Sequence, residues 1–375
     1  MGHFFRSLEI ARALEREKVI FVAGGERPDQ EIPSNIKYCQ LPGLAMDEHF
    51  GALMPTEPDR DLEEVKAERT ETLFRIFEKE RPDVFLIELF PFGRKAFRFE
   101  LIPLLDAIKE DRFGHVKVVC SLRDILVERD DGGKHEARVI KYLNKYFDML
   151  LIHSDPAIAS LEETFGNMEK IEIPCRYTGF AARKPLKGAR REIRDKMGLT
   201  GEDKLLIASA GGGKVGGELM SAVLDGFSSI KSQHARLLML TGPFLDSDAY
   251  ENLCNRAEKN TRIKIKRFAP DFTNLLMAGD AMVSMAGYNT CMDILASGIP
   301  AAVYPFSFNR EQTMRAEKIS RHIRLDILKQ EDLAISRMED IINNLLIRNR
   351  TSPDHGIDLN GAGNSAEIIR KAGNN

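Results

Sequence analysis

The sequence predicts an α/β protein of two domains, each built around a mostly parallel β-sheet. Short apolar runs alternate along the chain with segments of helical periodicity, which is the pattern of repeated βαβ units. The chain has 375 residues, more than one hydrophobic core usually organises. Residues 175–189 interrupt the alternation with glycine, proline and basic residues, as a linker does. We therefore expect an N-terminal domain over residues 1–178 and a C-terminal domain over residues 179–375.

The expected elements follow this alternation in order. A helix over 4–15 precedes the first strand, a helix near 61–80 precedes the second, and Pro156 after Asp155 predicts the start of another helix. In the second half, a helix follows each strand, and a short last helix ends the chain. The expected strands span 19–23, 84–87, 116–120, 149–153, 205–208, 237–241, 263–268, 282–284 and 301–304.

Composition narrows the class of protein. The formal net charge of −3 offers no basic surface for a polynucleotide, so nucleic-acid binding is not expected. Five cysteines are scattered without a Cys-x-x-Cys pair, which argues against disulfides and zinc and favours a reducing cytoplasm. The sequence has no apolar run of about 18 residues, so we expect no membrane-spanning segment.

A glycine-rich loop follows the strand expected at 205–208. It contains Gly211, Gly212 and Gly213, then Lys214, and a helix begins near Glu218. Glycine allows close backbone approach and positive φ, and a helix N-terminus presents free N–H groups to an anion. Taken by itself, the pattern fits a phosphate-binding loop and a flexible turn equally well. It is not a P-loop, because no Ser or Thr follows the lysine.

A second turn of small residues lies between the strand at 282–284 and the next helix. Ala286, Gly287 and Tyr288 form this turn, and Asp293 lies further along the helix, placed to accept hydrogen bonds from sugar hydroxyls. In an open parallel sheet, both turns would lie at the carboxyl ends of the strands. The alternative for Asp293 is a solvated carboxylate on a helix face.

One acidic motif invites a metal-binding interpretation. Asp246, Ser247 and Asp248 have the Asp-x-Asp spacing of a known metal-binding motif. They lie between a strand and a helix expected at 250–259, where Asp and Ser are ordinary N-caps. We therefore expect no metal site and no cofactor.

Several motifs together resemble a known family. The donor-binding half of glycosyltransferase family 28 is similar at residues 211–217, 284–293, 298–300 and 309–312, in order and spacing. The best-known family member adds N-acetylglucosamine to the lipid-linked peptidoglycan precursor. Residues 90–94, 121–124 and 177–179 resemble a bacterial branch called predicted glycosyltransferases. The resemblance covers nearly the whole chain.

The resemblance implies the GT-B architecture, in which two doubly wound Rossmann-like domains face each other across a cleft. It further implies a metal-independent, inverting transfer of a hexose or N-acetylhexosamine from a UDP-sugar to an unidentified acceptor of the cell envelope or a polysaccharide. The implied roles are diphosphate binding for the two turns, ribose binding for Asp293, where the family more usually has Glu, and nucleobase binding for Phe268 and Ala269. Arg310, Glu311 and Gln312 would contact the donor sugar.

The resemblance also singles out His3. Family members begin with an apolar strand and a glycine-rich turn that end in Gly-His, followed by Arg-Ser and a helix. Here Gly2 and His3 directly follow Met1. The first strand of the N-terminal domain is therefore expected to be absent. His3 is the expected catalytic residue, orienting or deprotonating an acceptor hydroxyl. The alternative is a frayed residue near the chain start.

Other functions remain open at this stage. A UDP-sugar hydrolase or epimerase, or a non-catalytic UDP-sugar-binding protein, could use the same fold. Basic and aromatic residues mixed over 90–99 suit a peripheral contact with the inner face of the membrane for a lipid-linked acceptor. A helix with one core face and one solvated face explains them as well.

Overall fold

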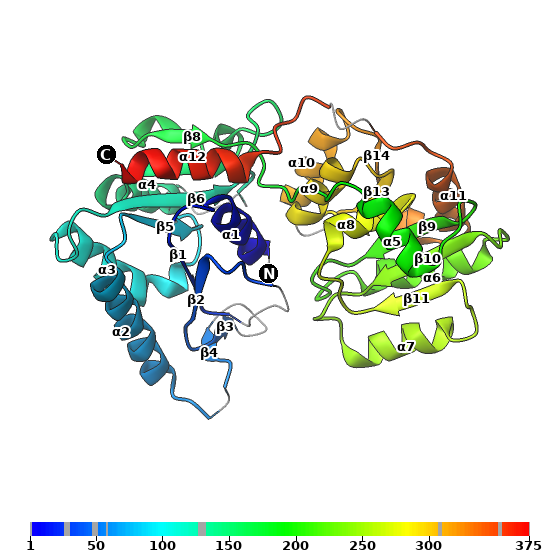
Figure 1. Ribbon diagram of the computed structural model, residues 1–375, viewed down its shortest axis with the longest axis horizontal. Helices are drawn as coiled ribbons and strands as arrows, with labels where there is room; N and C mark the ends of the chain where they lie inside the picture. Colours follow the sequence, from blue (N-terminus) through cyan, green and yellow to red (C-terminus); the bar gives the residue numbers. More distant parts are fainter. Residues whose placement is uncertain are drawn as a thin grey trace. The chain divides into compact units, whose positions relative to one another are not determined.

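The computed structural model describes residues 2–25, 31–46, 52–57, 59–126, 133–306, 310–351 and 355–374. They form two compact units (Figure 1): unit 1 comprises Met1–Ala181 and Asn360–Asn375, and unit 2 comprises Ala182–Leu359. Each unit is layered around parallel strands, which confirms the predicted α/β class.

The last helix belongs to unit 1 and not, as predicted, to the second domain. Figure 1 shows α12 (Gly361–Gly373) beside α1 (Gly2–Ala13). The apolar face of α12 explains this, because Ala366 and Ile369 pack into one buried cluster with Ile10 of α1. The predicted boundary after residue 178 therefore differs from the observed division, which lies after Ala181 and places the chain end with unit 1.

The two chain segments that connect the units lie side by side where they leave and re-enter unit 1. Ala181 and Asn360 form an isolated antiparallel bridge. The Gly361 amide donates to the carbonyl of Phe180 at 3.0 Å. A Cβ atom on Gly361 would lie 2.3 Å from the carbonyl oxygen of Gly179, so this crossing requires glycine.

Unit 1 contains a four-stranded parallel sheet in the order β5-β6-β7-β8, a separate parallel pair β1-β2 and a small antiparallel pair β3-β4. Helix α2 shows how the sequence sets these elements: the side chain of Asp61 caps its N-terminus by accepting from the amides of Glu63 and Glu64. The bounds are β1 Val19–Ala23, β2 Ile36–Gln40, β3 Leu44–Met46, β4 Leu53–Pro55, α2 Leu62–Glu80, β5 Val84–Glu88, α3 Arg98–Lys109, β6 Lys117–Arg123, α4 Lys134–Tyr146, β7 Met149–His153 and β8 Cys175–Tyr177, with short 3-10 turns at Lys95–Phe97, Leu161–Glu163 and Met168–Lys170.

The helix predicted to start at Pro156 is wrong. Residues 156–158 form a single turn that does not propagate. The carboxylate of Asp155 accepts from the amide of Ala157, and its carbonyl accepts from the amide of Ile158. These local bonds satisfy the turn without a following helix.

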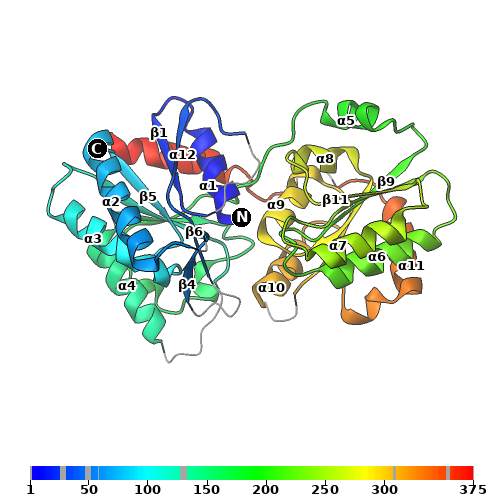
Figure 2. The same ribbon diagram turned by 90° about the horizontal axis from the view of Figure 1, so that it is seen from below.

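Unit 2 contains one six-stranded parallel sheet in the order β11-β10-β9-β12-β13-β14. Counted along the chain this order is 3-2-1-4-5-6, which is the doubly wound dinucleotide-binding topology. Figure 2 shows α5 and α8 on one face of this sheet and α6, α7 and α11 on the other. The bounds are α5 Ala189–Met197, β9 Lys204–Ser209, α6 Gly217–Ser229, β10 Ala235–Leu240, α7 Ser247–Ala257, β11 Ile263–Lys266, α8 Phe272–Ala278, β12 Ala281–Met285, α9 Tyr288–Ser297, β13 Ala301–Tyr304, α10 Arg310–Ile319, β14 Leu325–Ile327 and α11 Ile335–Leu346, with a 3-10 turn at Gln330–Leu333.

The strand order fixes where a ligand would bind in unit 2. The order reverses between β9 and β12, which are hydrogen-bonded neighbours although 75 residues separate the partners Leu206 and Ala281. In open parallel sheets, ligands bind beyond the carboxyl ends of the strands at such a switch point. Both predicted phosphate-binding turns follow these two strands.

Candidate functional site

The loop after β9 has the strained backbone that its glycines predicted. Gly211 and Gly213 have φ of 66° and 89°, in the left-handed region that favours glycine. A Cβ atom on Gly213 would lie 2.5 Å from the carbonyl oxygen of Thr241, and the carbonyl of Gly212 accepts from the amide of Phe244 at 3.0 Å. The loop after β10 therefore fixes this loop in place by backbone contact.

The amides of this loop are not equally available to an anion. The Gly211 amide donates to the Ser209 hydroxyl at 3.2 Å and the Gly213 amide to the Ala210 carbonyl at 3.4 Å. Within the part of the chain that the structure describes, the amide of exposed Gly212 has no protein acceptor. Lys214 is exposed at the end of the loop, directly before the turn into α6.

The second turn leads from β12 into α9, with Gly287 in the N-cap position. The amide of Ala286 donates to the Tyr304 carbonyl at 3.2 Å, so this predicted donor already serves the sheet. Tyr288 begins the helix, and its ring is buried with the Arg315 guanidinium 5.4 Å from its centroid. An anion here would therefore meet the N-terminal end of α9 and not the Tyr288 ring.

Asp293 is not a solvated carboxylate. Asp293 is 2% exposed and is one of the buried residues of α9. The carboxylate accepts from the Thr273 hydroxyl at 2.5 Å and from the Arg183 guanidinium at 2.9 Å. Burial raises its pKa, against the opposing effect of Arg183 and Thr273. The predicted ribose contact would therefore compete with, or join, an existing ion pair.

The remaining predicted donor-site residues lie at the same edge of the sheet. Phe268 and Ala269 follow β11 and are half-buried. Arg310, Glu311 and Gln312 begin α10. Glu311 is buried, and the side-chain oxygen Oε1 of Gln312 accepts from the Phe306 backbone amide at 3.0 Å. Position 309 of the family motif lies outside the described residues.

Asp246 acts as a helix cap, as predicted. Its side chain accepts from the amides of Asp248 and Ala249 at the start of α7. Among the described residues, no group of three or more His, Cys, Asp or Glu side chains could hold a metal ion. The expectation of a metal-free site stays a prediction.

Unit 1 contributes a polar cluster at the carboxyl end of its own sheet. His3 of α1 places Nδ1 3.1 Å from a carboxylate oxygen of Glu88, the last residue of β5. Arg6 donates to the same oxygen, and Ser121 of β6 donates to the other at 2.7 Å. The sequence predicted His3, whereas the remaining members were missed. Glu88 could have been found as a charged residue that ends an apolar strand.

A second histidine extends this cluster into the core. His153 ends β7 and is completely buried, with Nε2 2.8 Å from the Ser121 hydroxyl and Nδ1 2.9 Å from the Thr178 hydroxyl. Ser121 uses its proton toward Glu88, so its oxygen accepts from the Nε2–H of neutral His153. The result is a hydrogen-bonded chain from Thr178 through His153 and Ser121 to Glu88.

The electrostatics of the cluster fix its charges. Burial by itself would raise the pKa of Glu88, but Arg6 and His3 outweigh it, and the net pKa lies well below the usual value. Burial lowers the pKa of His153 to about 3 and that of His3 below 6.5, although Glu88 opposes the shift at His3. At neutral pH the cluster therefore holds an ionised carboxylate and two neutral imidazoles.

A proton on Nδ1 would let His3 donate to Glu88. Its Nδ1 is 3.1 Å from both Glu88 and the Arg6 guanidinium. Arg6 already donates to Glu88. If Nδ1 carries the proton, His3 donates to the same carboxylate, which is then paired with both Arg6 and His3. Nε2 then remains as the proton acceptor, on a side chain that is 33% exposed.

The aromatic and basic segment over 90–99 does not present all its rings to solvent. Phe90 and Phe92 are 1% and 3% exposed and belong to the unit 1 core. No helix in the described ranges is both long and apolar enough to cross a membrane. The core explanation therefore holds for these two residues.

Comparison with known proteins finds a family similarity in the second unit. The model of the glycosyltransferase family 28 C-terminal domain matches residues 209–355, which include both turns, Asp293 and the start of α10. This segment is therefore similar to the C-terminal domain of that family, over less than half of the chain. A transferase of Caldanaerobacter subterraneus, the UDP-N-acetylglucosamine–N-acetylmuramyl-(pentapeptide) pyrophosphoryl-undecaprenol N-acetylglucosamine transferase, is 23% identical over 214 residues, 55% of each chain. The chain thus spans about half the length of the curated relatives it matches.

Solved structures extend the comparison to nearly the whole chain. MurG of Acinetobacter baumannii superposes with a TM-score of 0.52 at 13% identity, covering 99% of this chain and 96% of that one. The UDP-GlcNAc 2-epimerase of Methanocaldococcus jannaschii gives a TM-score of 0.58 at 12% identity, covering 97% and 95%. At such identities the likeness establishes the fold alone. The predicted GT-B fold is confirmed.

Proposed function

We propose that this protein is a metal-independent, inverting glycosyltransferase that moves a hexose or N-acetylhexosamine from a UDP-sugar to a hydroxyl-bearing acceptor. The observation that carries the proposal is the pair of turns after β9 and β12 at the switch point of unit 2. They lie in the segment that matches the family 28 domain, and each leads into a helix N-terminus. In this proposal, backbone amides and helix dipoles supply the positive potential for the diphosphate, so the turns would need no metal ion.

The proposed chemistry divides between the units. The acceptor hydroxyl loses its proton to Nε2 of His3 as its oxygen forms the bond to the anomeric carbon, and the bond from that carbon to the diphosphate breaks. UDP leaves with the bonding electron pair, stabilised by the Gly212 amide and the N-terminal ends of α6 and α9. Glu88 holds His3 in the competent tautomer and stabilises the imidazolium that forms.

The proposal names the acceptor and the donor sugar only by their chemical class. The curated relatives use UDP-N-acetylglucosamine, as their names state. We propose a UDP-sugar as the donor of this chain because residues 209–355 match the family 28 domain. Free cysteines at all five positions support placing the reaction in a reducing cytoplasm. A peripheral membrane contact would require exposed side chains other than Phe90 and Phe92.

An epimerase or hydrolase is the competing function, because an epimerase shares the fold. The two classes differ in what they consume. A transferase should consume UDP-sugar only when an acceptor is added, for example a cell extract, and should release one UDP for each glycoside formed. Consumption of pure UDP-sugar at the same rate without extract would favour a hydrolase or epimerase. Donor binding without consumption in any extract would leave a binding protein.

UDP should bind without divalent metal. Titration calorimetry with and without a chelator is expected to give the same affinity, since the diphosphate meets backbone amides and helix N-termini. UDP at about 100 times its Kd should raise the free energy of unfolding by roughly 2.7 kcal/mol. An affinity that disappears with chelator and returns with Mg²⁺ or Mn²⁺ would contradict the metal-free site.

Replacing Asp293 by Ala is expected to weaken UDP binding by roughly 1–3 kcal/mol, the usual loss when a charged hydrogen-bond partner is removed. Because Asp293 also pairs with Arg183, the Arg183→Ala and double variants complete a cycle. A ribose contact predicts that Asp293→Ala weakens UDP binding in both backgrounds. If Asp293→Ala has no effect once Arg183 is gone, the carboxylate only positions Arg183. Asp248→Ala, at an exposed acid of the same unit, is the matched control.

A further inference from the structure

The parallel strands of unit 1 are divided between two sheets. Among the described residues, β1 pairs with β2 alone and β5 pairs with β6 alone. Within this part of the chain, β1 and β5 each have one edge without a hydrogen-bonded neighbour. Backbone N–H and C=O groups inside a domain need partners, and an unpaired apolar edge is a template for another strand.

β1 and β5 run in the same direction. At their start, Lys18, which directly precedes β1, forms a 2.6 Å salt bridge with Glu80 at the end of α2, the helix that precedes β5. At their other end, the Arg69 guanidinium donates to the carbonyl of Gly24, directly after β1, at 3.3 Å. Arg69 also pairs with Glu100 in the first turn of α3, the helix that follows β5. The two strands therefore begin at one end of unit 1 and finish at the other.

The side chains of β1 and β5 belong to the same hydrophobic clusters on both faces. Val19 of β1 and Leu86 of β5 pack against the cluster that contains Ile10 of α1. On the opposite face, Val22 of β1 packs against the core cluster that contains Ile87 of β5. The same layers of helices therefore cover both strands, although no backbone hydrogen bond between described residues joins them. A strand between them would lie about 4.8 Å from each and would meet both clusters.

The hydrogen bonds of the two strands identify the peptide groups at the open edges. In a parallel strand, the N–H and C=O groups of alternate residues point toward opposite neighbours. The Ala23 carbonyl accepts from the amide of Leu41, after β2, at 2.7 Å, and the Leu89 amide donates to the Ser121 carbonyl of β6 at 2.8 Å. The groups that point away from β2 and β6 are therefore those of Ile20 and Val22 in β1 and of Val84, Leu86 and Glu88 in β5.

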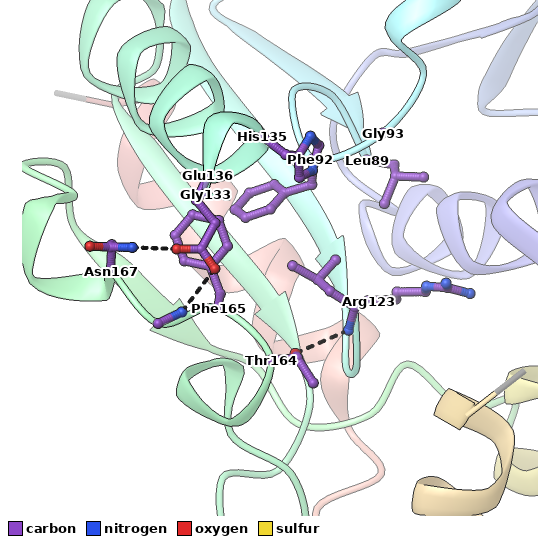
Figure 3. Close-up of a pocket in the computed structure, with 12 residues that line it drawn as sticks. Leu89, Phe92, Gly93, Arg123, Gly133, His135, Glu136, Thr164, Phe165 and Asn167 are labelled. Atoms are coloured by element: carbon purple, nitrogen blue, oxygen red, sulfur yellow. Dashed lines mark hydrogen bonds between the residues drawn. The ribbon is translucent and has the colours of Figure 1, made fainter. Parts of the chain in front are cut away.

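A pocket in unit 1 lies away from these open edges. Figure 3 shows Leu89, after β5, and Arg123, at the end of β6, among the residues that line it. The other described residues that line it follow β5, β6 or β7, and none of them belongs to β1 or β2. The pocket is therefore not the place where an added strand would pair.

Unit 2 has a strand in the corresponding position. Its first strand, β9, is followed by α6, which leads to β10, and β9 pairs with both β10 and β12. In unit 1, α1 leads to β1 in the same way, and β5 is the next parallel strand after the β1–β2 pair. The position of β9 in unit 2 therefore corresponds to the position between β1 and β5 in unit 1.

We propose that the open edges of β1 and β5 form a strand-binding slot, and that its occupant is an extended apolar segment of another polypeptide. The segment inserts parallel to both strands and joins the two parallel sheets of unit 1 into one. Its two faces meet hydrophobic clusters, so a nearly continuous apolar sequence fits, as in β9. Neither β1 nor β5 contains the lysine or proline that commonly prevents such pairing. This inference goes beyond the proposed transferase function and does not depend on it.

A matched pair of peptides tests the pairing. The probe is a fluorescent peptide with the β9 sequence, Lys-Leu-Leu-Ile-Ala-Ser, and the control has the same side chains but a methyl group on every second backbone nitrogen. In an anisotropy titration of the full chain we expect saturable binding of the probe and about tenfold weaker binding of the control, because main-chain hydrogen bonds supply the affinity of an added strand. Equal binding of both peptides, or no saturable binding of the probe, would overturn the proposal.

Two proline variants test the location. Ile20→Pro removes an N–H that faces the slot and leaves the β1–β2 hydrogen bonds in place, so the protein should fold. Ile265→Pro is the matched control, since it alters a half-buried isoleucine of β11, the edge strand of unit 2, whose neighbour Lys266 points toward β10. We expect Ile20→Pro to weaken probe binding about tenfold and Ile265→Pro to leave it unchanged. Equal probe affinity in the two folded variants would show that the peptide binds elsewhere.

Amide hydrogen exchange of the unaltered protein tests the slot without any variant. Without the probe, the amides of Ile20 and Leu86 should exchange fast, and saturating probe should slow them by about tenfold or more. The amides of Phe21 and Phe85, which point toward β2 and β6, should exchange slowly in both states. If Ile20 and Leu86 still exchange fast in the probe-saturated protein, the slot is wrong. Calorimetry with UDP on the same sample reports on the proposed transferase separately, because the proposed diphosphate site lies on unit 2.

Discussion

His3→Ala is expected to lower the rate of sugar transfer by about 10²–10⁴ while leaving the affinity for UDP unchanged. The physical reason is the loss of a neutral imidazole whose Nδ1 is held by ionised Glu88 and whose Nε2 is left to take the acceptor proton. UDP binding should not change, because the proposed diphosphate site lies on unit 2. Single-turnover rates and calorimetry on the same preparation measure the two quantities.

Controls separate a base from a residue that merely starts α1. His234→Ala alters an exposed histidine of unit 2 and should leave the rate unchanged. Glu88→Gln should slow transfer and displace the acid limb of the pH–rate profile. In the unaltered protein that limb should lie below pH 6.5, because burial lowers the His3 pKa and the rate rises as His3 loses its proton. A rate for His3→Ala within twofold of the original would mean that His3 has only a structural role.

Unit 1 should lose stability as the pH falls below 6.5, with a contribution from His153 alone on the order of 4–5 kcal/mol by pH 3. The sign follows from linkage: the unfolded chain takes up a proton near pH 6.5, whereas the buried imidazole does so only near its folded pKa of about 3. Between these values the unfolded state binds one more proton, so its free energy falls relative to the folded state by roughly 1.4 kcal/mol per pH unit. Above pH 6.5 neither state binds this proton, so His153 causes no loss of stability there.

Denaturant unfolding between pH 6.5 and 4.5 measures this slope before Glu88, whose unfolded pKa is 4.5, begins to contribute in the same direction. His153→Gln keeps polar atoms toward Ser121 and Thr178 but cannot titrate, so the slope should decrease by about one proton. His3→Ala controls for the smaller effect of the second lowered pKa. Equal slopes for His153→Gln and the unaltered protein would mean that His153 titrates normally in the folded state.

The elements that sequence predicted best are those with strong local signals. The strands at Val19–Ala23, Met149–His153 and Ala301–Tyr304 begin and end where predicted, because apolar runs with clear polar or glycine boundaries leave little choice. Asp246 as a cap and the left-handed glycines of the 211–213 loop were predictable for the same reason. In each case the determinant lies within a few residues.

The parts that were missed depend on distant residues. The cluster of Glu88, Ser121 and His153 forms only because β5, β6 and β7 are adjacent and parallel. No local sequence pattern predicts that strand order. Asp293 was predicted as a ligand contact, yet its burial depends on Thr273 and Arg183, 20 and 110 residues away. Helix α12 has the amphipathic pattern of any surface helix, so its sequence could not say which unit it covers.

Because α12 belongs to unit 1, the sequence of unit 2 is inserted within the sequence of unit 1. Its two ends meet where Ala181 pairs with Asn360, and the glycine at 361 allows that close approach. A chain cut after Ala181 would leave unit 1 without the helix whose Ser365 hydroxyl lies 3.5 Å from His153. Unit 2, by contrast, is one continuous block, so a different domain could be grafted between residues 181 and 360 while unit 1 keeps all its own strands and helices.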